Sequence, residues 1–203
     1  MMPVKVCGIT NLEDALCCIE HGVSALGFIF ADSKRRVMPE TVYQISRKLP
    51  LFITKIGVFV NEDPLIIKEI LKECRLDLAQ LHGEESPATA DVLAGRAIKT
   101  FRAGYDLPDP TWAEAPLKAI LIDTYSPEAA GGTGTVFDWN CFRQYRQLGF
   151  PMILAGGLNS ANIHQAIQIT LPDAIDLSSG VERVPGKKDR QKVKSLMAEM
   201  KKY

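Results

Sequence analysis

Eight short apolar runs recur along the chain, and a segment with helical spacing follows each of them. They occupy residues 4–7, 25–30, 52–60, 77–81, 97–101, 119–122, 152–155 and 174–177. Runs of this kind, nearly continuous and rich in β-branched side chains, are typical of strands that are buried on both faces of a parallel sheet. The alternation therefore predicts an α/β fold in which helices cover a parallel sheet.

Residues that start and stop helices stand between these runs. Side chains suited to N-caps and prolines suited to first turns precede the helical segments at Asn11, Pro39, Asp63-Pro64, Ser86-Pro87, Asn159-Ser160 and Asp189. Gly22 stands where a glycine would end the first helix. Residues 104–116 are rich in proline, so we expect the fifth helix to be short or irregular.

Two architectures accommodate eight strands that alternate with helices in 203 residues, a (β/α)8 barrel and a doubly wound open sheet. The count of eight favours the barrel. So does the distribution of functional-looking side chains, which follow nearly every strand instead of gathering at one switch point. We expect a TIM barrel that forms a single small domain over residues 1–203.

The composition excludes several classes of function. Lysine plus arginine number 24, and so do aspartate plus glutamate, so no net field attracts nucleic acid or an anionic membrane. The apolar runs fall far short of the ~20 residues of a membrane span. The five cysteines form no C-x-x-C pair, which argues against a disulfide framework and a zinc site. We expect a cytoplasmic protein without metal or cofactor, and either a monomer or a homodimer.

Glycine-bearing segments follow the seventh and eighth strands. The first contains Gly156 and Gly157, and the second contains Ser179 and Gly180. Barrels that bind phosphorylated ligands usually hold the phosphate in these two loops, where backbone N–H groups converge on it. Either pair alone is also compatible with a simple tight turn. Together they predict a phosphate site, and hence a phosphorylated small molecule as the substrate.

Cys7 and Asp123 end the first and sixth strands. A cysteine in this position is either a small buried hydrophobe or, as a thiolate, a general base, which would need a pKa near neutrality. A carboxylate directly after a buried strand is costly unless it is paired, hydrated or catalytic. At the C-terminal end of a barrel strand the catalytic interpretation is favoured. We therefore expect Cys7 and Asp123 to form an acid–base pair at the mouth of the barrel.

Further polar residues follow other strands. Arg35 and Arg36 come after the second strand and form either a solvated face or a clamp for a carboxylate. Residues 131–134, behind Asp123, read Gly-Gly-Thr-Gly and are suited to a loop that closes over a ligand. Four more side chains are expected to line the mouth without an assigned role: Gln80, His82, Arg102 and Asp176.

Taken in order, these motifs resemble the phosphoribosylanthranilate isomerase family of tryptophan biosynthesis, and they span nearly the whole chain. The matching segments are KVCGIT at 5–10, LGFIFADSKRRV at 26–37, GVFVN at 57–61, QLHGEE at 80–85, KTFR at 99–102, LIDTYSPEAAGGTGTVFDW at 121–139, ILAGGLNSANI at 153–163 and DLSSGVERVPGKKD at 176–189.

The resemblance implies a cofactor-free isomerase. Its reaction is the Amadori rearrangement of N-(5′-phosphoribosyl)anthranilate to 1-(2-carboxyphenylamino)-1-deoxyribulose 5-phosphate. Asp123 would be the general acid that opens the furanose ring, and Cys7 the general base that takes the proton from C2′. The arginine for the anthranilate carboxylate would be Arg35. The stretch before it is one residue shorter than in many relatives, and Arg36 stands where an aromatic residue often sits, so Arg36 is a second candidate.

Two alternatives stay open. The histidine-pathway isomerase performs the same chemistry with two aspartates, but Cys7 stands where that enzyme carries one of them, and no loop for a second phosphate is evident. A catalytically silent phosphate-binding barrel is the other alternative. Such a scaffold has no need for Cys7, Asp123 and an arginine clamp together.

Overall fold

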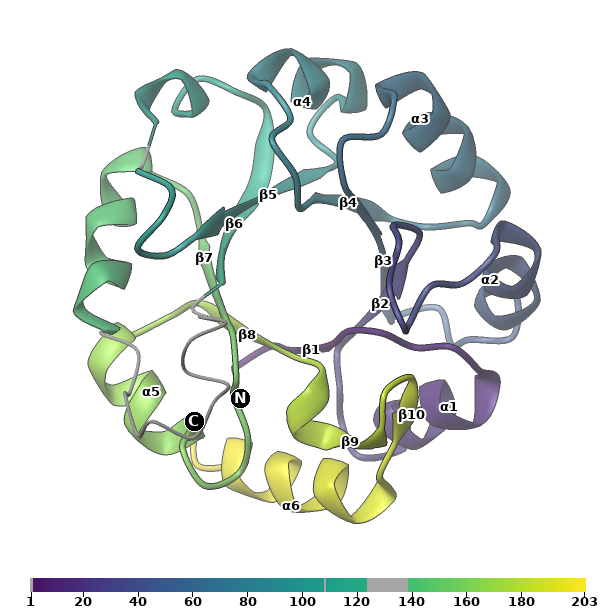
Figure 1. Ribbon diagram of the computed structural model, residues 1–203. Coiled ribbons are helices and arrows are strands. Elements are labelled where there is room, and N and C mark those ends of the chain that lie inside the picture. The colour runs from purple at the N-terminus through teal and green to yellow at the C-terminus, as the bar shows by residue number, and fades with distance from the viewer. Residues whose placement is uncertain (1, 108, 124–138) are drawn as a thin grey trace.

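A computed structural model describes residues 2–107, 109–123 and 139–203, and its centre is a closed ring of parallel strands (Figure 1). Each strand pairs with the next, and the last pairs with the first, which makes a barrel and excludes the open sheet. The predicted barrel is therefore confirmed. Its strands are β1 (Val4–Val6), β2 (Ala25–Ile29), β3 (Thr54–Phe59), β4 (Leu78–Leu81), β5 (Ala97–Arg102), β6 (Leu117–Asp123), β7 (Met152–Ala155) and β8 (Ala174–Leu177).

Helices surround the barrel on its outside (Figure 1). The α-helices are α1 (Leu12–Glu20), α2 (Pro39–Ser46), α3 (Pro64–Glu73), α4 (Pro87–Leu93), α5 (Ile163–Thr170) and α6 (Arg190–Met200). The caps at Asn11, Asp63 and Asp189 are confirmed, because each side chain accepts a hydrogen bond from a backbone N–H of the first turn. Gly22 follows the end of α1 with a φ of +96°, as a terminating glycine does.

Two of the expected helix starts differ in the structure. Ser86 precedes α4, but its side chain makes no capping hydrogen bond, so Pro87 in the first turn is the effective signal. Asn159 does not cap α5, which begins only after Asn162. The Asn159 side chain accepts from the backbone N–H of Ala161 instead, so it closes a turn within the loop after β7.

Among its described residues the fifth connection holds only the three-residue 3₁₀ turn η1 (Pro110–Trp112), which confirms the irregular fifth helix. Its Trp112 is buried and meets the ring of Phe101 edge-on, with centroids 6.4 Å apart. This aromatic contact covers the barrel where a longer helix would otherwise pack. The sixth connection ends in a longer 3₁₀ segment, η3 (Trp139–Leu148).

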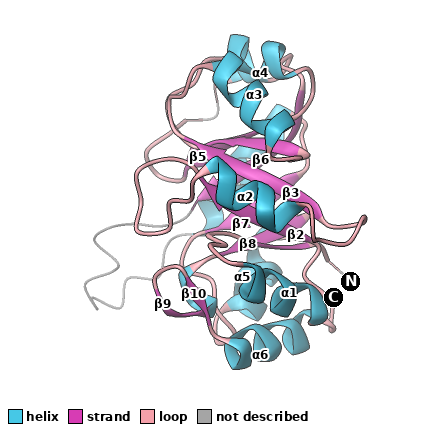
Figure 2. Ribbon diagram, turned by 90° about the vertical axis from the view of Figure 1, so that its right-hand side faces the viewer, coloured by secondary structure: helices cyan, strands magenta, loops and turns pink. Residues whose placement is uncertain are grey.

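A small hairpin after β8 was not expected from the sequence. The 3₁₀ turn η4 (Ser179–Val181) leads into β9 (Glu182–Val184), which pairs antiparallel with β10 (Lys187–Lys188). Figure 2 shows this hairpin standing at one end of the barrel. Strands this short and this charged carry no alternating apolar pattern, so periodicity could not reveal them.

Two apolar layers fill the molecule. The larger lies between the barrel and its helices, and the smaller fills the barrel interior with Ile56, Ile98, Ala119, Leu121, Ile153 and Ala155. Cys17, Cys18 and Cys74 are buried packing residues, whereas Cys141 is half-buried. Among the helices that the structure describes, none combines the length and apolarity needed to cross a membrane.

Candidate active site

A cavity of about 490 Å³ opens at the C-terminal ends of the barrel strands. Such an end is where TIM-barrel enzymes place their catalytic residues. Nine of the residues singled out in the sequence line this cavity: Cys7, Arg35, Gln80, His82, Asp123, Gly156, Gly157, Asp176 and Ser179. They come from strands on all sides of the ring, so the barrel itself brings them together.

Three other candidates lie outside the cavity lining. Arg36 is exposed, and Arg102 is more than half exposed and forms an ion pair with Asp106 at 2.9 Å. Gly180 packs against the loop after β7, where a Cβ atom would lie 1.9 Å from the carbonyl oxygen of Leu158. Only glycine permits this approach, so Gly180 holds the loops after β7 and β8 against each other.

Cys7 stands above a buried ion pair inside the barrel. The register of β1 and β8 sets Lys5 beside Asp176, and Lys5 Nζ lies 2.8 Å from Asp176 Oδ2. Gly27 on β2 makes room for them, since a Cβ there would lie 2.7 Å from Cys7 Sγ and 3.1 Å from Lys5 Cε.

The ionisation of Cys7 differs from the sequence expectation. Burial raises the pKa of the Cys7 thiol above its ordinary value, although the positive charge of Lys5 opposes that rise. A catalytic thiolate had been expected to have a pKa near neutrality. Burial inside the barrel reverses that direction, so Cys7 is a thiol in the free protein at neutral pH.

His82 joins Gln80 to Asp123 on the other side of the cavity. Gln80 Nε2 lies 3.0 Å from His82 Nδ1, and His82 Nε2 faces Asp123 Oδ2 at 3.6 Å. Burial lowers the pKa of His82, while Asp123 acts in the opposite direction. A neutral imidazole that accepts from Gln80 at Nδ1 carries its proton on Nε2, facing the carboxylate of Asp123.

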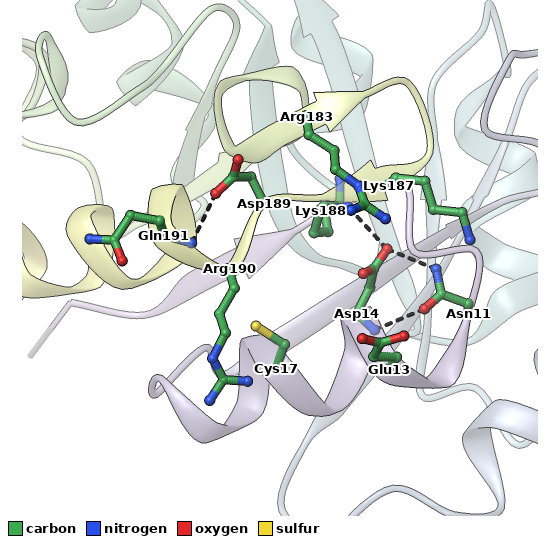
Figure 3. A pocket seen from close by; sticks show the side chains of 10 residues that line it. All are labelled: Asn11, Glu13, Asp14, Cys17, Arg183, Lys187, Lys188, Asp189, Arg190 and Gln191. Carbon is green, nitrogen blue, oxygen red and sulfur yellow. Dashed lines mark hydrogen bonds between the residues drawn. The ribbon is translucent and has the colours of Figure 1, made fainter.

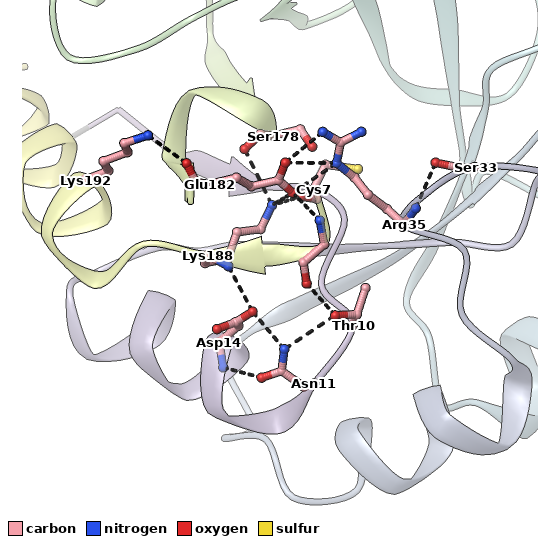
Figure 4. A network of polar contacts seen from close by, with 11 residues as sticks. Cys7, Thr10, Asn11, Asp14, Ser33, Arg35, Ser178, Glu182, Lys188 and Lys192 are labelled. Carbon is pink, nitrogen blue, oxygen red and sulfur yellow. Dashed lines mark hydrogen bonds and ion pairs between the residues drawn. The ribbon is translucent and has the colours of Figure 1, made fainter. Parts of the chain in front are cut away.

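Arg35 is held by a network that reaches across the hairpin (Figure 4). Its Nε and Nη2 donate to both oxygens of Glu182, with Nη2 2.7 Å from Oε2. Lys188, almost fully buried, donates to Glu182 Oε1 at 2.9 Å and to the carbonyl oxygen of Cys7 at 2.6 Å. The Arg35 side chain crosses Gly8, where a Cβ would lie 2.6 Å from Arg35 Cδ. The network thereby fixes the arginine next to Cys7.

The loop after β7 exposes its backbone to the cavity. Gly156 and Gly157 have φ values of +96° and +61°, which L side chains rarely adopt. A Cβ on Gly157 would meet no other atom within 4 Å, so the backbone conformation and not crowding requires that glycine. Ser179 begins η4 in the neighbouring loop, which follows β8. The two loops lie against each other through Gly180 and face one end of the cavity.

A smaller hollow of about 280 Å³ lies between α1, the hairpin and α6 (Figure 3). Its polar groups largely satisfy one another. Asp14 accepts from Asn11 and from the backbone of Lys188, and Asp189 caps α6. These bonds tie the hairpin to the helices, so this hollow has a structural explanation and the mouth cavity is the candidate active site.

The sequence profile of the family described as N-(5′-phosphoribosyl)anthranilate (PRA) isomerase matches residues 4–199. The chain belongs to the PRA isomerase family. An N-(5′-phosphoribosyl)anthranilate isomerase of Citrifermentans bemidjiense is 45% identical over 203 residues, covering 100% of this chain and 98% of its own. Membership makes the chain an isomerase of tryptophan biosynthesis, as the sequence resemblance implied.

Solved PRA isomerases share the barrel over its whole length. One was determined in complex with reduced 1-(o-carboxyphenylamino)-1-deoxyribulose 5-phosphate, and it matches with a TM-score of 0.87 and 38% identity over 100% of both chains. Another consists of mutually generated monomers of the dimeric enzyme from Thermotoga maritima. It matches with a TM-score of 0.86 and 37% identity, also over 100% of both chains.

Three residues of this PRA isomerase site were missed from the sequence. Lys5 had a usable signal, because a charged residue two positions before Cys7 must share its face of the strand. Glu182 and Lys188 had none, since they reach the site only through the unexpected hairpin. The proposed closing loop at residues 131–134 lies outside the part of the chain that the structure describes.

Proposed function

We propose that the mouth cavity catalyses the Amadori rearrangement of N-(5′-phosphoribosyl)anthranilate with Asp123 as general acid and Cys7 as general base. The observation that carries this proposal is their convergence on one cavity from β6 and β1, three strands apart around the ring. A furanose that lies across the cavity meets a carboxyl group on one side and a thiol on the other. Ring opening and enolisation need those two groups at neighbouring atoms.

The proton transfers balance without any other reactant. The proton of the Cys7 thiol first passes to the Asp123 carboxylate, which gives the reactive pair of acid and thiolate. Asp123 gives its proton to the ring oxygen, the C1′–O bond breaks, and the nitrogen lone pair forms the iminium. The Cys7 thiolate then takes the C2′ proton, and the electron pair of that C–H bond forms the enolamine and neutralises the nitrogen. The C2′ hydroxyl finally loses its proton as C1′ gains one, which gives the ketone. Each positioned acid or base typically contributes about 10²–10⁴-fold to the rate.

The two charged ends of the substrate fit different parts of the cavity. The loops with Gly156, Gly157, Ser179 and Gly180 would hold the 5′-phosphate through backbone N–H groups. Arg35 would bind the anthranilate carboxylate. Glu182 occupies its Nε and Nη2, whereas Nη1 makes no hydrogen bond within the described residues and can donate to the substrate. Arg36 and Arg102, which do not line the cavity, would contribute only positive charge near its mouth.

The test is loss of the fluorescence of freshly generated phosphoribosylanthranilate, with the aminoketone product quantified in parallel. Fluorescence must decay faster than by spontaneous hydrolysis, and the product must equal the substrate lost. Release of free anthranilate instead of the product would overturn the proposal. A Cys7→Ser variant with unchanged turnover would remove Cys7 as the base.

We also propose a homodimer, since the Thermotoga maritima relative is described as dimeric. Leu51 and Phe52 are adjacent and the most exposed large apolar side chains among the described residues, at 84% and 91%. A second copy would cover them. Light scattering should give twice the chain mass, and Phe52→Lys should give a monomer. A wild-type monomer at micromolar concentration would refute this.

The location and the domain organisation follow as smaller proposals. Five unpaired cysteines suit a reducing cytoplasm. One domain over residues 1–203 should unfold in a single cooperative transition, with coincident fluorescence and circular dichroism curves. Transitions that separate by probe would argue for two folding units.

A further inference from the structure

Three buried side-chain oxygens in the described part of the chain have no hydrogen-bond partner. They are Gln80 Oε1, Asp176 Oδ1 and Ser178 Oγ. All three residues line the mouth cavity, so every such atom in the described residues belongs to one place. A buried acceptor without a donor is as costly as a lost hydrogen bond, and proteins rarely leave several together without a use.

Two of these atoms are acceptors only, and both are held rigidly. Gln80 directs its amide Nε2 to His82 and to Thr100 Oγ1, which turns Oε1 away from them. Asp176 Oδ2 accepts a hydrogen bond from the Lys5 ammonium at 2.8 Å, and Asp176 Oδ1 is the oxygen that is left without a donor. Gln80 is 2% exposed and Asp176 is 7% exposed.

Both acceptors belong to side chains on barrel strands that line the cavity, and we call the two together the floor of the cavity. Gln80 lies on β4 and Asp176 on β8, which are diametrically opposite strands in the ring of eight. A ligand that lies across the barrel therefore meets one acceptor on each side. The proposed phosphate loops and Arg35 line the same cavity.

The chemistry of the floor selects neutral hydrogen-bond donors. An ionised phosphate or carboxylate group offers oxygens that accept hydrogen bonds, so it cannot satisfy two further acceptors. A cation gains little, because Lys5 already neutralises Asp176. Hydroxyl groups fit, since each can donate to one acceptor without bringing in charge.

We propose that Asp176 Oδ1 and Gln80 Oε1 form a hydroxyl-binding floor that accepts hydrogen bonds from the sugar chain of the substrate. This rests on the proposed function, because the phosphate and the carboxylate place the sugar between them. Ring opening leaves a linear chain with hydroxyls at C2′, C3′ and C4′, so the floor distinguishes a sugar from an apolar chain of equal length. Lys5 is a positioning residue that orients Asp176: burial raises the pKa of the Asp176 carboxyl, and the ammonium of Lys5 at 2.8 Å opposes that rise.

The first experiment compares two ligands by calorimetry. One is reduced 1-(2-carboxyphenylamino)-1-deoxyribulose 5-phosphate, which has all three hydroxyls, and the other is 5-(2-carboxyphenylamino)pentyl phosphate, which has none. Both carry the same charged ends. We expect the wild type to bind the hydroxylated ligand at least about tenfold more tightly, because hydrogen bonds to buried and charged acceptors are among the stronger ones.

Two variants test which residues produce that preference. Gln80→Met removes one acceptor, and the double variant Lys5→Met/Asp176→Leu removes the other without stranding a buried charge. Each should lower the preference to about threefold or less while affinity for the pentyl phosphate stays within about threefold. The matched control is Lys99→Met/Glu85→Gln, which removes a buried pair at 2.8 Å that does not line the cavity and should keep the preference.

The outcomes separate the two proposals. A wild type that binds both ligands equally overturns the hydroxyl-binding floor and leaves the charged sites standing. Variants that keep the tenfold preference also overturn it, and Gln80→Met gives that answer even if the double variant fails to fold. A wild type that binds neither ligand contradicts the proposed function itself.

Discussion

Removing the charge of Glu182 tests whether the hairpin holds Arg35 in place. Its carboxylate is 4% exposed and neutralises both Arg35 and Lys188, which is itself 1% exposed. Breaking a buried ion pair by removing one partner costs about 3–5 kcal/mol. Glu182→Gln keeps the volume and one acceptor oxygen, so we expect the free energy of unfolding to fall by about 2–4 kcal/mol.

The loss should depend on pH in a defined direction. Burial alone would raise the pKa of Glu182, but hydrogen bonds from Arg35 and Lys188 outweigh it and hold that pKa below the ordinary 4.5. A lowered carboxylate pKa gives stability that is present above the unfolded pKa and lost as pH falls through the folded one. Wild-type and Glu182→Gln stabilities should therefore differ most above about pH 5 and converge in acid.

Urea unfolding between pH 3 and pH 8 measures this difference, and steady-state kinetics measures its effect on Arg35. We expect KM to rise about tenfold and kcat to change less than about threefold, since substrate binding and not proton transfer is affected. Glu20→Gln is the control, because its exposed pair with Arg190 should contribute below about 1 kcal/mol. Equal losses for the two variants at pH 7 would refute the structural role of Glu182.

Three further outcomes follow from the site. Asp123→Asn removes the proposed acid, so its residual kcat/KM should rise about tenfold per pH unit from about pH 7 to 9 as Cys7, with its raised pKa, ionises; a flat profile would exclude a thiolate base. Gly180→Ala forces a Cβ against Leu158, so it should cost about 1–3 kcal/mol of stability and weaken inhibition by phosphate about tenfold; unchanged inhibition would place the phosphate elsewhere. Cys18→Ala should lower stability by about 1–2 kcal/mol and leave kcat unchanged, since that thiol is only packing; a loss of turnover would contradict this.

The barrel could be predicted because its strands are buried on both faces and therefore stand out in the sequence as apolar runs. Those runs recovered β7 and β8 to the residue. The run at 52–60 was too long at its start, because Phe52 is apolar but exposed, and β3 begins at Thr54. An apolar residue is buried only where another part of the chain covers it. The local sequence pattern cannot show that Phe52 is left uncovered.

Most of the site could also be predicted, since a barrel brings the ends of all its strands to one mouth. The missing part was the charge network behind it. Glu182 and Lys188 meet Arg35 through a hairpin whose strands are too short to show a pattern. The direction of the Cys7 pKa was wrong for a similar reason, because burial and the distance to Lys5 depend on packing in three dimensions.

The most direct test of the acid–base pair is single-turnover conversion of phosphoribosylanthranilate carrying deuterium at C2′. Loss of the C2′ hydrogen to Cys7 predicts a primary isotope effect in the wild type. It also predicts a fall in rate of about 10²–10⁴-fold in Cys7→Ala and in Asp123→Asn. A Cys7→Ala enzyme that keeps both the wild-type rate and the isotope effect would contradict the account, because another group would then be taking the C2′ proton.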